Sequence, residues 1–399
     1  MAAIFAAAGG AETWLVERTG DGGRKILISG GGRCNILPAR VEERRFVTDS
    51  SRATLRNMLR SWPLGEQVAF FERELGLPLV EESETGKLFP ASNRARDVRD
   101  GLLALAARRG ARFLPRTTVT GIARAGPGWR VSAETAAPLE VDAVVIATGG
   151  LSVPATGSDG RGLAIAAELG HTIHPTYPAL TPIVCQPPAF ASLAGVSLPV
   201  TIPARDTARD GGGSLTAGGG FLFTHRGYSG PAVLDVSHVV VRSRLEGSSG
   251  ARLAVRWCEL DQKGWEAALQ PRGTHTVLGV IRRELPERLA EALVAAAGVP
   301  PSQTLAQLRR DERRRLIDML VRAPLAWTGD EGYRKAEVTG GGVNLAEIDP
   351  HTMESRRHPG LYLCGEVLDA FGPIGGYNFL WAWATGRAAG TGAARPTGV

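Results

Sequence analysis

Five glycines and three cationic side chains crowd into fourteen residues near the start of the chain, Gly22-Gly23-Arg24-Lys25-Ile26-Leu27-Ile28-Ser29-Gly30-Gly31-Gly32-Arg33-Cys34-Asn35. Three consecutive glycines leave one loop without a Cβ atom, so a flat ligand or another backbone can approach it closely. The neighbouring guanidinium and ammonium groups add positive charge and hydrogen-bond donors. A flexible, solvated turn is the alternative, but such turns seldom combine a glycine triplet with an apolar Ile-Leu-Ile run. We therefore interpret the stretch as a loop suited to a pyrophosphate or an electron-rich ring.

The length and composition are those of an ordinary globular protein. The chain has 399 residues, of which 43% are hydrophobic and 22% charged, and this length suggests two or three domains. The net charge of +6 raises the question of an acidic partner. Arginine runs such as Arg309-Arg310 alternate with acids, as on a solvated helix face, and no aromatic platform accompanies them. We therefore expect a small-molecule substrate and no nucleic-acid partner.

The cysteines exclude several kinds of site. The four cysteines are Cys34, Cys185, Cys258 and Cys364. They are far apart and form no C-x-x-C pair, which argues against a disulfide scaffold, a zinc ribbon and a dithiol redox centre. We expect no metal site. No apolar run reaches the roughly 18 residues of a transmembrane helix, and the N-terminus lacks the basic region of a signal peptide. We therefore predict no membrane association and a cytoplasmic location.

The N-terminal segment has the order of elements found in a dinucleotide-binding unit. An alanine-rich helix over residues 1–8 ends at Gly9-Gly10, and Thr13–Val16 reads as a short buried strand. Glu17 follows this strand, where an acid in βαβ units accepts hydrogen bonds from a ribose hydroxyl. No strand and no G-x-G-x-x-G turn precede the helix, so only the second half of the unit is recognisable. Taken alone, Glu17 is equally consistent with a surface acid.

Two later apolar stretches end in small residues and predict ligand contacts at the edge of a parallel sheet. Val141–Ala147 reads as a buried strand that leads into Thr148-Gly149-Gly150, and Gly360–Cys364 as a last strand that leads into Gly365-Glu366. Ligands bind at the carboxyl ends of such strands. Gly372–Asn378 is a second glycine-rich loop, which enters the last helix and so presents free amides and a positive dipole end.

The middle of the chain has a different character. Strand-like stretches from Pro178 to Glu259 alternate with glycine-rich turns such as Gly211-Gly212-Gly213, which predicts an antiparallel barrel or sandwich, and residues 263–323 have helical periodicity. His225 could donate a proton there, although a capped loop histidine is the simpler interpretation. We predict an α/β protein in which a discontinuous Rossmann-like domain carries an inserted β-barrel and a helical subdomain. The predicted domains are 1–178 with 335–399, 179–260, and 261–334.

Four segments resemble the BaiN/RdsA-type family of NAD(P)/FAD-dependent oxidoreductases, flavoproteins with the glutathione-reductase-like FAD fold. They follow the family's order and span nearly the whole chain: Gly23–Asn35, Ala147–Pro154, Phe223–Pro231 and Gly360–Ala384. The resemblance implies FAD as the bound cofactor and NAD(P)H as the reductant. Because no second G-x-G-x-x-G motif is found, we expect the nicotinamide to dock transiently.

The resemblance also assigns cofactor contacts residue by residue. Glu17 would hold the adenosine ribose, Val119 would meet the adenine through its backbone, and Glu366 would lie near the ribityl chain. The remaining cofactor-binding positions come from the first glycine loop, the two strand ends and the second glycine loop: Arg24, Lys25, Gly31, Gly32, Arg33, Cys34, Asn35, Thr148, Gly149, Gly365, Gly375, Gly376, Tyr377 and Asn378. The resemblance identifies no catalytic residue.

One departure from the family concerns the first residues. Members begin with a strand and a G-x-G-x-x-G turn upstream of the helix that here starts at Met1. Either the start codon is misassigned or the diphosphate loop has been lost, which would weaken FAD binding and destabilise the sheet. We hypothesise truncation, because every downstream cofactor segment is intact.

The leading functional hypothesis is a FAD-dependent oxidoreductase that passes hydride from NAD(P)H through the flavin to an organic acceptor, such as a conjugated C=C bond. Two alternatives stay open. One is a degenerate flavoprotein that has lost tight FAD binding, and the other is an RNA-modifying flavoprotein, suggested by the net charge of +6. The sequence identifies neither the acceptor nor the oligomeric state.

Overall fold

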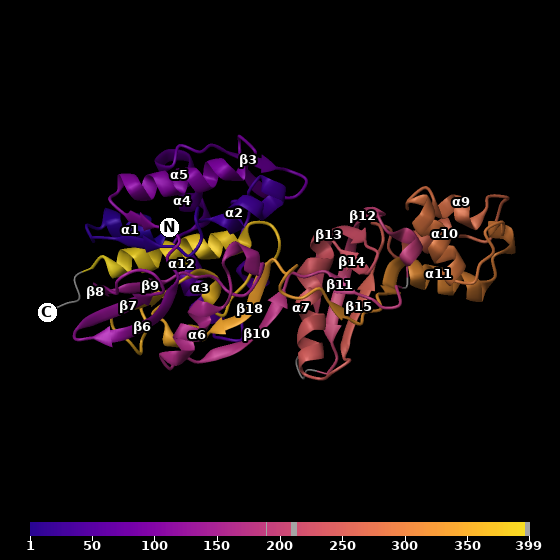
Figure 1. Cartoon of the computed structure of the whole chain (residues 1–399). Helices are drawn as coiled ribbons and strands as arrows, with labels where there is room; N and C mark the ends of the chain where they lie inside the picture. Colours follow the sequence, from indigo (N-terminus) through magenta and orange to yellow (C-terminus); the bar gives the residue numbers. More distant parts are fainter. Residues whose placement is uncertain (189, 209–213, 396–399) are drawn as a thin grey trace. The chain divides into compact units, whose positions relative to one another are not determined.

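The computed structural model describes residues 1–188, 190–208 and 214–395, and these residues form two compact units (Figure 1). The first unit consists of Met1–Pro178 and Glu337–Val399, and the second of Ala179–Ala336. Each unit has a hydrophobic core of its own. The turn predicted at residues 211–213 lies outside the described residues.

The first unit is built from short strands and from helices that cover them. Its helices are α1 (Ala2–Ala8), α2 (Arg24–Ile28), α3 (Arg52–Arg60), α4 (Leu64–Ala69), α5 (Ala95–Arg108), α6 (Arg161–Glu168) and α12 (Tyr377–Ala393). Its strands are β1 (Trp14–Val16), β2 (Leu37–Pro38), β3 (Leu79–Glu82), β4 (Lys87–Pro90), β5 (Arg112–Leu114), β6 (Val119–Ala125), β7 (Gly128–Ala133), β8 (Leu139–Val141), β9 (Val144–Ile146), β10 (Ile173–Ala179), β18 (Val338–Val343) and β19 (Leu361–Leu363). The α/β class and the Rossmann-like character are therefore confirmed.

Parallel pairing in the first unit occurs between strands far apart in the sequence. Strand β1 pairs with β5, and β9 pairs with β19 in a register that sets Ile146 opposite Leu363. The single strand predicted over residues 141–147 is wrong in its extent, because Val141 ends the β6–β7–β8 sheet and the parallel strand begins at Val144. The physical reason is the register of two different sheets: Val141 faces Trp129 of β7, whereas the Val144 amide donates to the Gly360 carbonyl.

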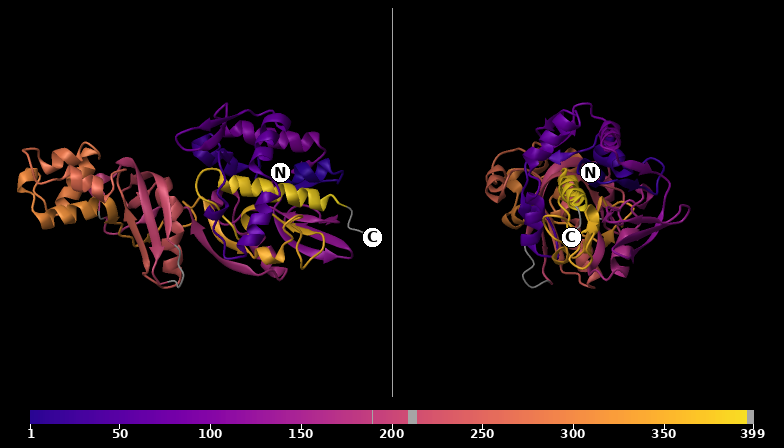
Figure 2. Two further views of the ribbon diagram at one scale, coloured as in Figure 1. Left: turned by 180° about the vertical axis from the view of Figure 1, so that it is seen from behind. Right: turned by 90° about the vertical axis from the view of Figure 1, so that its left-hand side faces the viewer.

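Helix α12 runs through the middle of the first unit (Figure 2). Its residues are buried along most of its length, including Trp381 and Trp383, which confirms core packing for both tryptophans. Glycine at position 390 allows α1 to pack directly on this helix, because a Cβ there would overlap the carbonyl of Ala2. Such a helix, apolar on all sides, acts as the interior scaffold of a domain.

The second unit is an antiparallel sheet with helices. Among the described residues its sheet has seven strands in the order β16-β15-β12-β13-β14-β11-β17. The strands are β11 (Ile183–Val184), β12 (Ser197–Asp206), β13 (Leu215–Phe223), β14 (Gly227–Ser229), β15 (Ala251–Val255), β16 (Ala323–Pro324) and β17 (Gly329–Asp330). Its helices are α7 (Pro231–Leu245), α8 (Gln262–Ala268), α9 (Val277–Ile281), α10 (Glu287–Ala296) and α11 (Arg310–Arg322). Both edge strands thus come from residues 323–330, which follow the stretch with helical periodicity (263–323) and lie within the predicted helical subdomain, 261–334.

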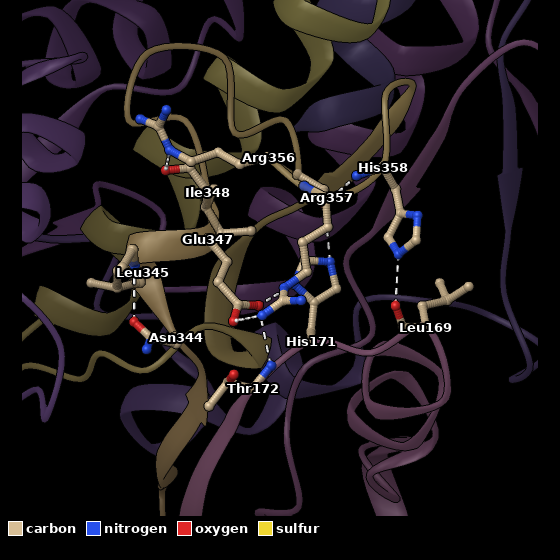
Figure 3. A network of polar contacts seen from close by, with 12 residues as sticks. Leu169, His171, Thr172, Asn344, Leu345, Glu347, Ile348, Arg356, Arg357 and His358 are labelled. Atoms are coloured by element: carbon tan, nitrogen blue, oxygen red, sulfur yellow. Dashed lines mark hydrogen bonds and ion pairs between the residues drawn. The ribbon is translucent and has the colours of Figure 1, made fainter.

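A network of polar contacts around His171 connects the turn before β19 to the residues that follow α6 (Figure 3). The His171 ring nitrogens contact Glu347 (Nδ1 to Oε2, 2.8 Å) and Ser355 (Nε2 to Oγ, 3.0 Å). Because the Ser355 hydroxyl oxygen already accepts backbone N–H groups from Arg357 and His358, its proton points to Nε2 and the Nδ1–H donates to Glu347. Arg357 donates to the other Glu347 oxygen at 2.7 Å. The network therefore holds a neutral imidazole against a carboxylate.

This network predicts a loss of stability on acidification. Burial lowers the pKa of His171 below its ordinary value of 6.5. Burial alone would raise the pKa of Glu347, but hydrogen bonds from Arg357, Thr172 and His171 outweigh it and lower the pKa to about 2. Below pH 6.5, His171 binds a proton more readily in the unfolded state than in the folded state. Below pH 4.5 the same holds for Glu347.

We therefore expect the free energy of unfolding to fall as the pH drops through 6.5 and to fall again below 4.5. Urea titrations at a series of pH values measure this dependence. In the variant His171→Gln the first decline should be weaker, and in Glu347→Gln the second. Identical pH profiles for the wild type and both variants would contradict the assignment.

Candidate functional site

The parallel register of β9 and β19 brings two of the predicted ligand-contacting segments to one edge. Ile146 and Leu363 are partners at the ends of their strands, and the Cys364 amide donates to the Ile146 carbonyl at 3.1 Å. Thr148-Gly149 and Gly365-Glu366 therefore leave the sheet side by side. The carboxyl edge of parallel strands is where α/β proteins bind ligands.

The Glu366 carboxylate is the centre of a polar cluster, which we call the Lys25 cluster: Lys25, Ser152, Thr339 and Glu366. One Glu366 oxygen accepts from the Lys25 ammonium at 2.7 Å. The other accepts from the Ser152 hydroxyl at 2.7 Å and from the Thr339 amide at 3.0 Å. Lys25 also donates to Ser152. The side chains of Lys25 and Glu366 are 29% and 17% exposed, so one side of the ion pair stays accessible.

The glycine triplet follows α2 and has an open surface. Gly30, Gly31 and Gly32 adopt positive φ angles of 55°, 67° and 85°, which side chains rarely tolerate. Gly31 and Gly32 are exposed, and nothing lies within 4 Å of the position that a Gly31 Cβ would take. The stretch predicted as one loop is thus a helix of five residues, Arg24–Ile28, followed by a glycine turn. The helix directs Lys25 toward Glu366, and the turn leaves bare backbone beside it.

The two glycine loops touch each other. With its amide oriented to satisfy both partners, Asn35 accepts from the Gly376 amide at 3.0 Å and donates to the Leu37 carbonyl at 3.1 Å. Gly376 has a φ of 88°, and a Cβ there would overlap the backbone of Leu37. Glycine at position 376 therefore lets the second glycine loop approach Leu37 closely, and the hydrogen bonds of Asn35 hold the two segments together.

The other predicted residues of the second loop stabilise it. The Asn378 amide makes two hydrogen bonds with the backbone of Gly372, each 2.9 Å long. The Tyr377 ring is buried, and its hydroxyl donates to the Arg40 carbonyl at 3.1 Å. Gly375 is half-buried beside the Lys87 side chain. The side chains of Tyr377 and Asn378 therefore hold this loop in its conformation.

Three predicted side chains of the first loop have partners within the protein. Arg24 pairs with Asp21 at 2.7 Å. Arg33 pairs with Glu82 at 3.0 Å and its guanidinium lies 4.1 Å from the centre of the Phe89 ring. Cys34 is fully buried, and burial raises the pKa of its thiol to about 11. The thiol is therefore protonated at neutral pH and is a poor nucleophile.

Glu17 and Val119 lie together, away from the Lys25 cluster in the sequence but in the same unit. Glu17 directly follows β1, and its carboxylate accepts from the Thr19 amide at 2.7 Å. Its carbonyl accepts from Thr117, two residues before Val119, at 2.9 Å. Val16 and Val119 line a small apolar cavity of about 30 Å³. The predicted adenosine contacts are thus neighbours in space.

The sequence alone did not identify two members of the Lys25 cluster. Ser152 is fully buried although it is polar, and Thr339 is buried on β18. Ser152 lies within the segment Ala147–Pro154, which carried part of the resemblance. The contact of Thr339 with Glu366 is non-local, so no spacing in the sequence could have indicated it. Among the described residues, no group of three or more His, Cys, Asp or Glu could hold a metal ion, and no helix is long and apolar enough to cross a membrane.

Comparison with known proteins identifies the family. The model of the HI0933-like protein Rossmann domain matches residues 1–392. The chain belongs to this family. It is 33% identical over 390 residues to a ribosomal RNA dihydrouridine synthase of Escherichia coli (strain K12), covering 94% of this chain and 90% of that protein. It is 30% identical over 406 residues to a 3-dehydro-bile acid delta(4,6)-reductase of Clostridium scindens, covering 99% of this chain and 96% of that protein.

Among solved structures, a 3-ketosteroid-delta4-(5alpha)-dehydrogenase from Rhodococcus jostii RHA1 matches with a TM-score of 0.47 and 16% identity, covering 99% of this chain and 94% of that one. Family membership confirms the resemblance to BaiN/RdsA-type proteins and makes the chain a member of the FAD-dependent oxidoreductase superfamily.

The residues present fit a flavin cofactor. The exposed glycine turn can accept a flat ring system against bare backbone, and the helix that leads into this turn carries the Lys25 ammonium, which supplies positive charge. The accessible side of Glu366 offers carboxylate oxygens to hydroxyl groups. Glu17, the residue expected to hold the ribose, directly follows β1 and is hydrogen-bonded to the segment that leads into Val119.

The contrast between two glycines gives a test of this geometry. Replacing Gly31 with alanine places a methyl group in open space, so we expect only backbone strain, about 1–2 kcal/mol of lost stability. Replacing Gly376 adds overlap with Leu37 to the same strain, so Gly376→Ala should lose clearly more. Chemical denaturation of both variants measures the difference. Equal losses would show that the two loops are not packed as described.

Proposed function

We propose that this protein is a FAD-dependent reductase that takes hydride from NAD(P)H and delivers it to a C=C bond conjugated with a carbonyl group. The observation that carries the proposal is the Lys25 cluster beside the exposed glycine turn, in a chain of the FAD-dependent oxidoreductase superfamily. The names of both relatives support the acceptor class. Dihydrouridine is uridine in which the C=C bond conjugated with a carbonyl group has been reduced. In a 3-oxo steroid with a Δ4 double bond, the C=C bond is likewise conjugated with the ketone.

The bound flavin would supply the hydride chemistry, and the protein would bind, orient and electrostatically tune it. Glu366 and Ser152 accept hydrogen bonds from the Lys25 ammonium group and fix it at the site. Asn35 fixes the distance between the two glycine loops, so the backbone on both sides is preorganised. Glu366, fixed by three donors, offers its accessible side to hydroxyl groups of the cofactor. We also place the protein in the cytoplasm, where its four free cysteines would stay reduced.

An absorbance spectrum tests this proposal most simply. We expect protein purified with FAD to be yellow and to bleach under anaerobic conditions when NADH or NADPH is added. A colourless protein that takes up no added FAD would instead support the degenerate flavoprotein. A yellow protein that neither nucleotide bleaches would retain the cofactor and reject NAD(P)H as the reductant.

RNA is a second candidate for the acceptor, because the positive charge of the chain is concentrated in one unit. Residues 179–336 contain 20 Lys and Arg against 15 Asp and Glu, whereas the rest of the chain contains 26 against 25. One relative is named for ribosomal RNA. A phosphate backbone would be attracted by such an excess of cations.

Binding to a ribosomal RNA fragment over a series of salt concentrations separates the two acceptor classes. If the acceptor is a base within RNA, the logarithm of the association constant should fall steeply and linearly as the logarithm of the salt concentration rises. No retention at low salt would reject RNA and leave a free small molecule as the acceptor.

A further inference from the structure

Strand β4 brings side chains to both glycine loops. The Phe89 Cε1 atom lies 3.1 Å from the position that a Cβ of Gly30 would take, in the first loop. The Lys87 Cε and Cγ atoms lie 3.9 and 4.0 Å from the corresponding position at Gly375, in the second loop. Because Lys87 and Phe89 are two residues apart on one strand, their side chains belong to the same face of it. One face of β4 therefore contacts both loops of the candidate flavin site.

The backbone of β4 is attached to the segment on which the second glycine loop packs. The Ile36 amide donates to the Leu88 carbonyl at 2.9 Å. Ile36 directly follows Asn35, whose side chain accepts from the Gly376 amide at 3.0 Å. The contact between Lys87 and the second glycine loop is thus set by backbone hydrogen bonds on either side of it.

No acid compensates the Lys87 ammonium group at close range in the part of the chain that the structure describes. Glu82 is directly opposite Lys87 in the β3–β4 register, but its carboxylate already accepts from Arg33 at 3.0 Å and from the Thr85 hydroxyl at 2.6 Å. Among the described residues, no hydrogen bond engages the half-buried Lys87 side chain, and Glu337 interacts with it only beyond 4 Å. Such a cation favours a negatively charged ligand beside it.

The two lysines of the candidate site differ in their charge balance. Lys25 pairs with Glu366 at 2.7 Å, and this pair has no net charge, whichever of the two groups holds the proton. Lys87 brings a cationic group to the second glycine loop without an ion-pair partner among the described residues. Two-electron reduction makes a flavin ring more negative, and nearby charges tune its electronics. The uncompensated cation that can respond to this change is therefore Lys87.

We propose that Lys87 contacts the flavin ring and supplies the positive charge that stabilises its reduced, negatively charged form. This inference rests on the FAD binding in the proposed function. When NAD(P)H is oxidised, its hydride carries two electrons to the flavin, which is reduced. Lys87 lowers the free energy of the reduced cofactor through its charge, and it exchanges neither a proton nor an electron itself.

Sulfite binding tests the proposal without NAD(P)H or an acceptor. Sulfite bonds through its sulfur to an oxidised flavin and leaves negative charge on the ring, so a nearby cation strengthens its binding. In the full-length protein loaded with FAD, Lys87→Met keeps an unbranched side chain beside Gly375 and should weaken sulfite binding about tenfold or more.

Two variants serve as controls for this measurement. Lys87→Arg keeps the charge and should stay within about threefold of the wild type. Lys263→Met removes an exposed lysine of α8 in the second unit and should match the wild type. A sulfite affinity that is unchanged in Lys87→Met, or lowered equally in Lys87→Met and Lys87→Arg, overturns the proposal.

The midpoint potential of the bound flavin is a second readout. If Lys87→Met weakens the binding of reduced FAD tenfold more than that of oxidised FAD, the potential falls by about 30 mV. Dithionite titration with a reference dye measures this shift. Equal losses in both redox states leave the potential unchanged, and this result overturns the proposal even if FAD binds less tightly to the variant.

The outcomes separate this inference from the proposed function. If the wild type takes up FAD but neither NADH nor NADPH bleaches it, the proposed reductant fails, whereas the sulfite affinity and the potential still decide the role of Lys87. A wild type that bleaches normally, with a Lys87→Met variant identical to it in both readouts, overturns the role of Lys87 alone. A wild type that takes up no FAD rejects both.

Discussion

Helix α12 holds the two halves of the candidate site through hydrogen bonds from its buried side chains. The indole of Trp381 donates to the Gly365 carbonyl at 3.0 Å, and the Thr385 hydroxyl accepts from the Gly365 amide at 3.0 Å. The indole of Trp383 donates to the carbonyl of Ile36 at 3.2 Å, one residue after Asn35. Since α12 lies in the middle of the first unit, Gly365 and Ile36 are both attached to the interior of that unit (Figure 1).

This attachment makes the Lys25 cluster possible. Glu366 follows Gly365 directly, so its carboxylate has a fixed origin and can be reached by donors from three other segments. A carboxylate that is only 17% exposed is stable when such donors satisfy it. The cluster thus joins α2, the loop after β9, β18 and β19 at one point. On the proposed function, these hydrogen bonds hold Lys25 and Glu366 in place on one side of the flavin.

The sequence predicted elements better than contacts. The glycine positions of both loops, the helix at the start of the chain and the burial of Trp381 followed from local patterns, because backbone freedom and hydrophobicity are local properties. The shortness of the parallel strand at Val144 was missed, because the apolar run around Asp142 continues through two different sheets. Ser152 and Thr339 were missed for another reason. Their significance depends on partners tens to hundreds of residues away, and no spacing in a single sequence encodes such contacts.

The central claim is that the first unit binds FAD at the two glycine loops. Hydrogen–deuterium exchange of the full-length protein, with and without FAD, tests it most directly because it localises the cofactor. We predict that FAD slows exchange of backbone amides in both Arg24–Asn35 and Gly372–Asn378. Binding of FAD that protects neither segment, or that protects only residues of the second unit, would contradict the claim.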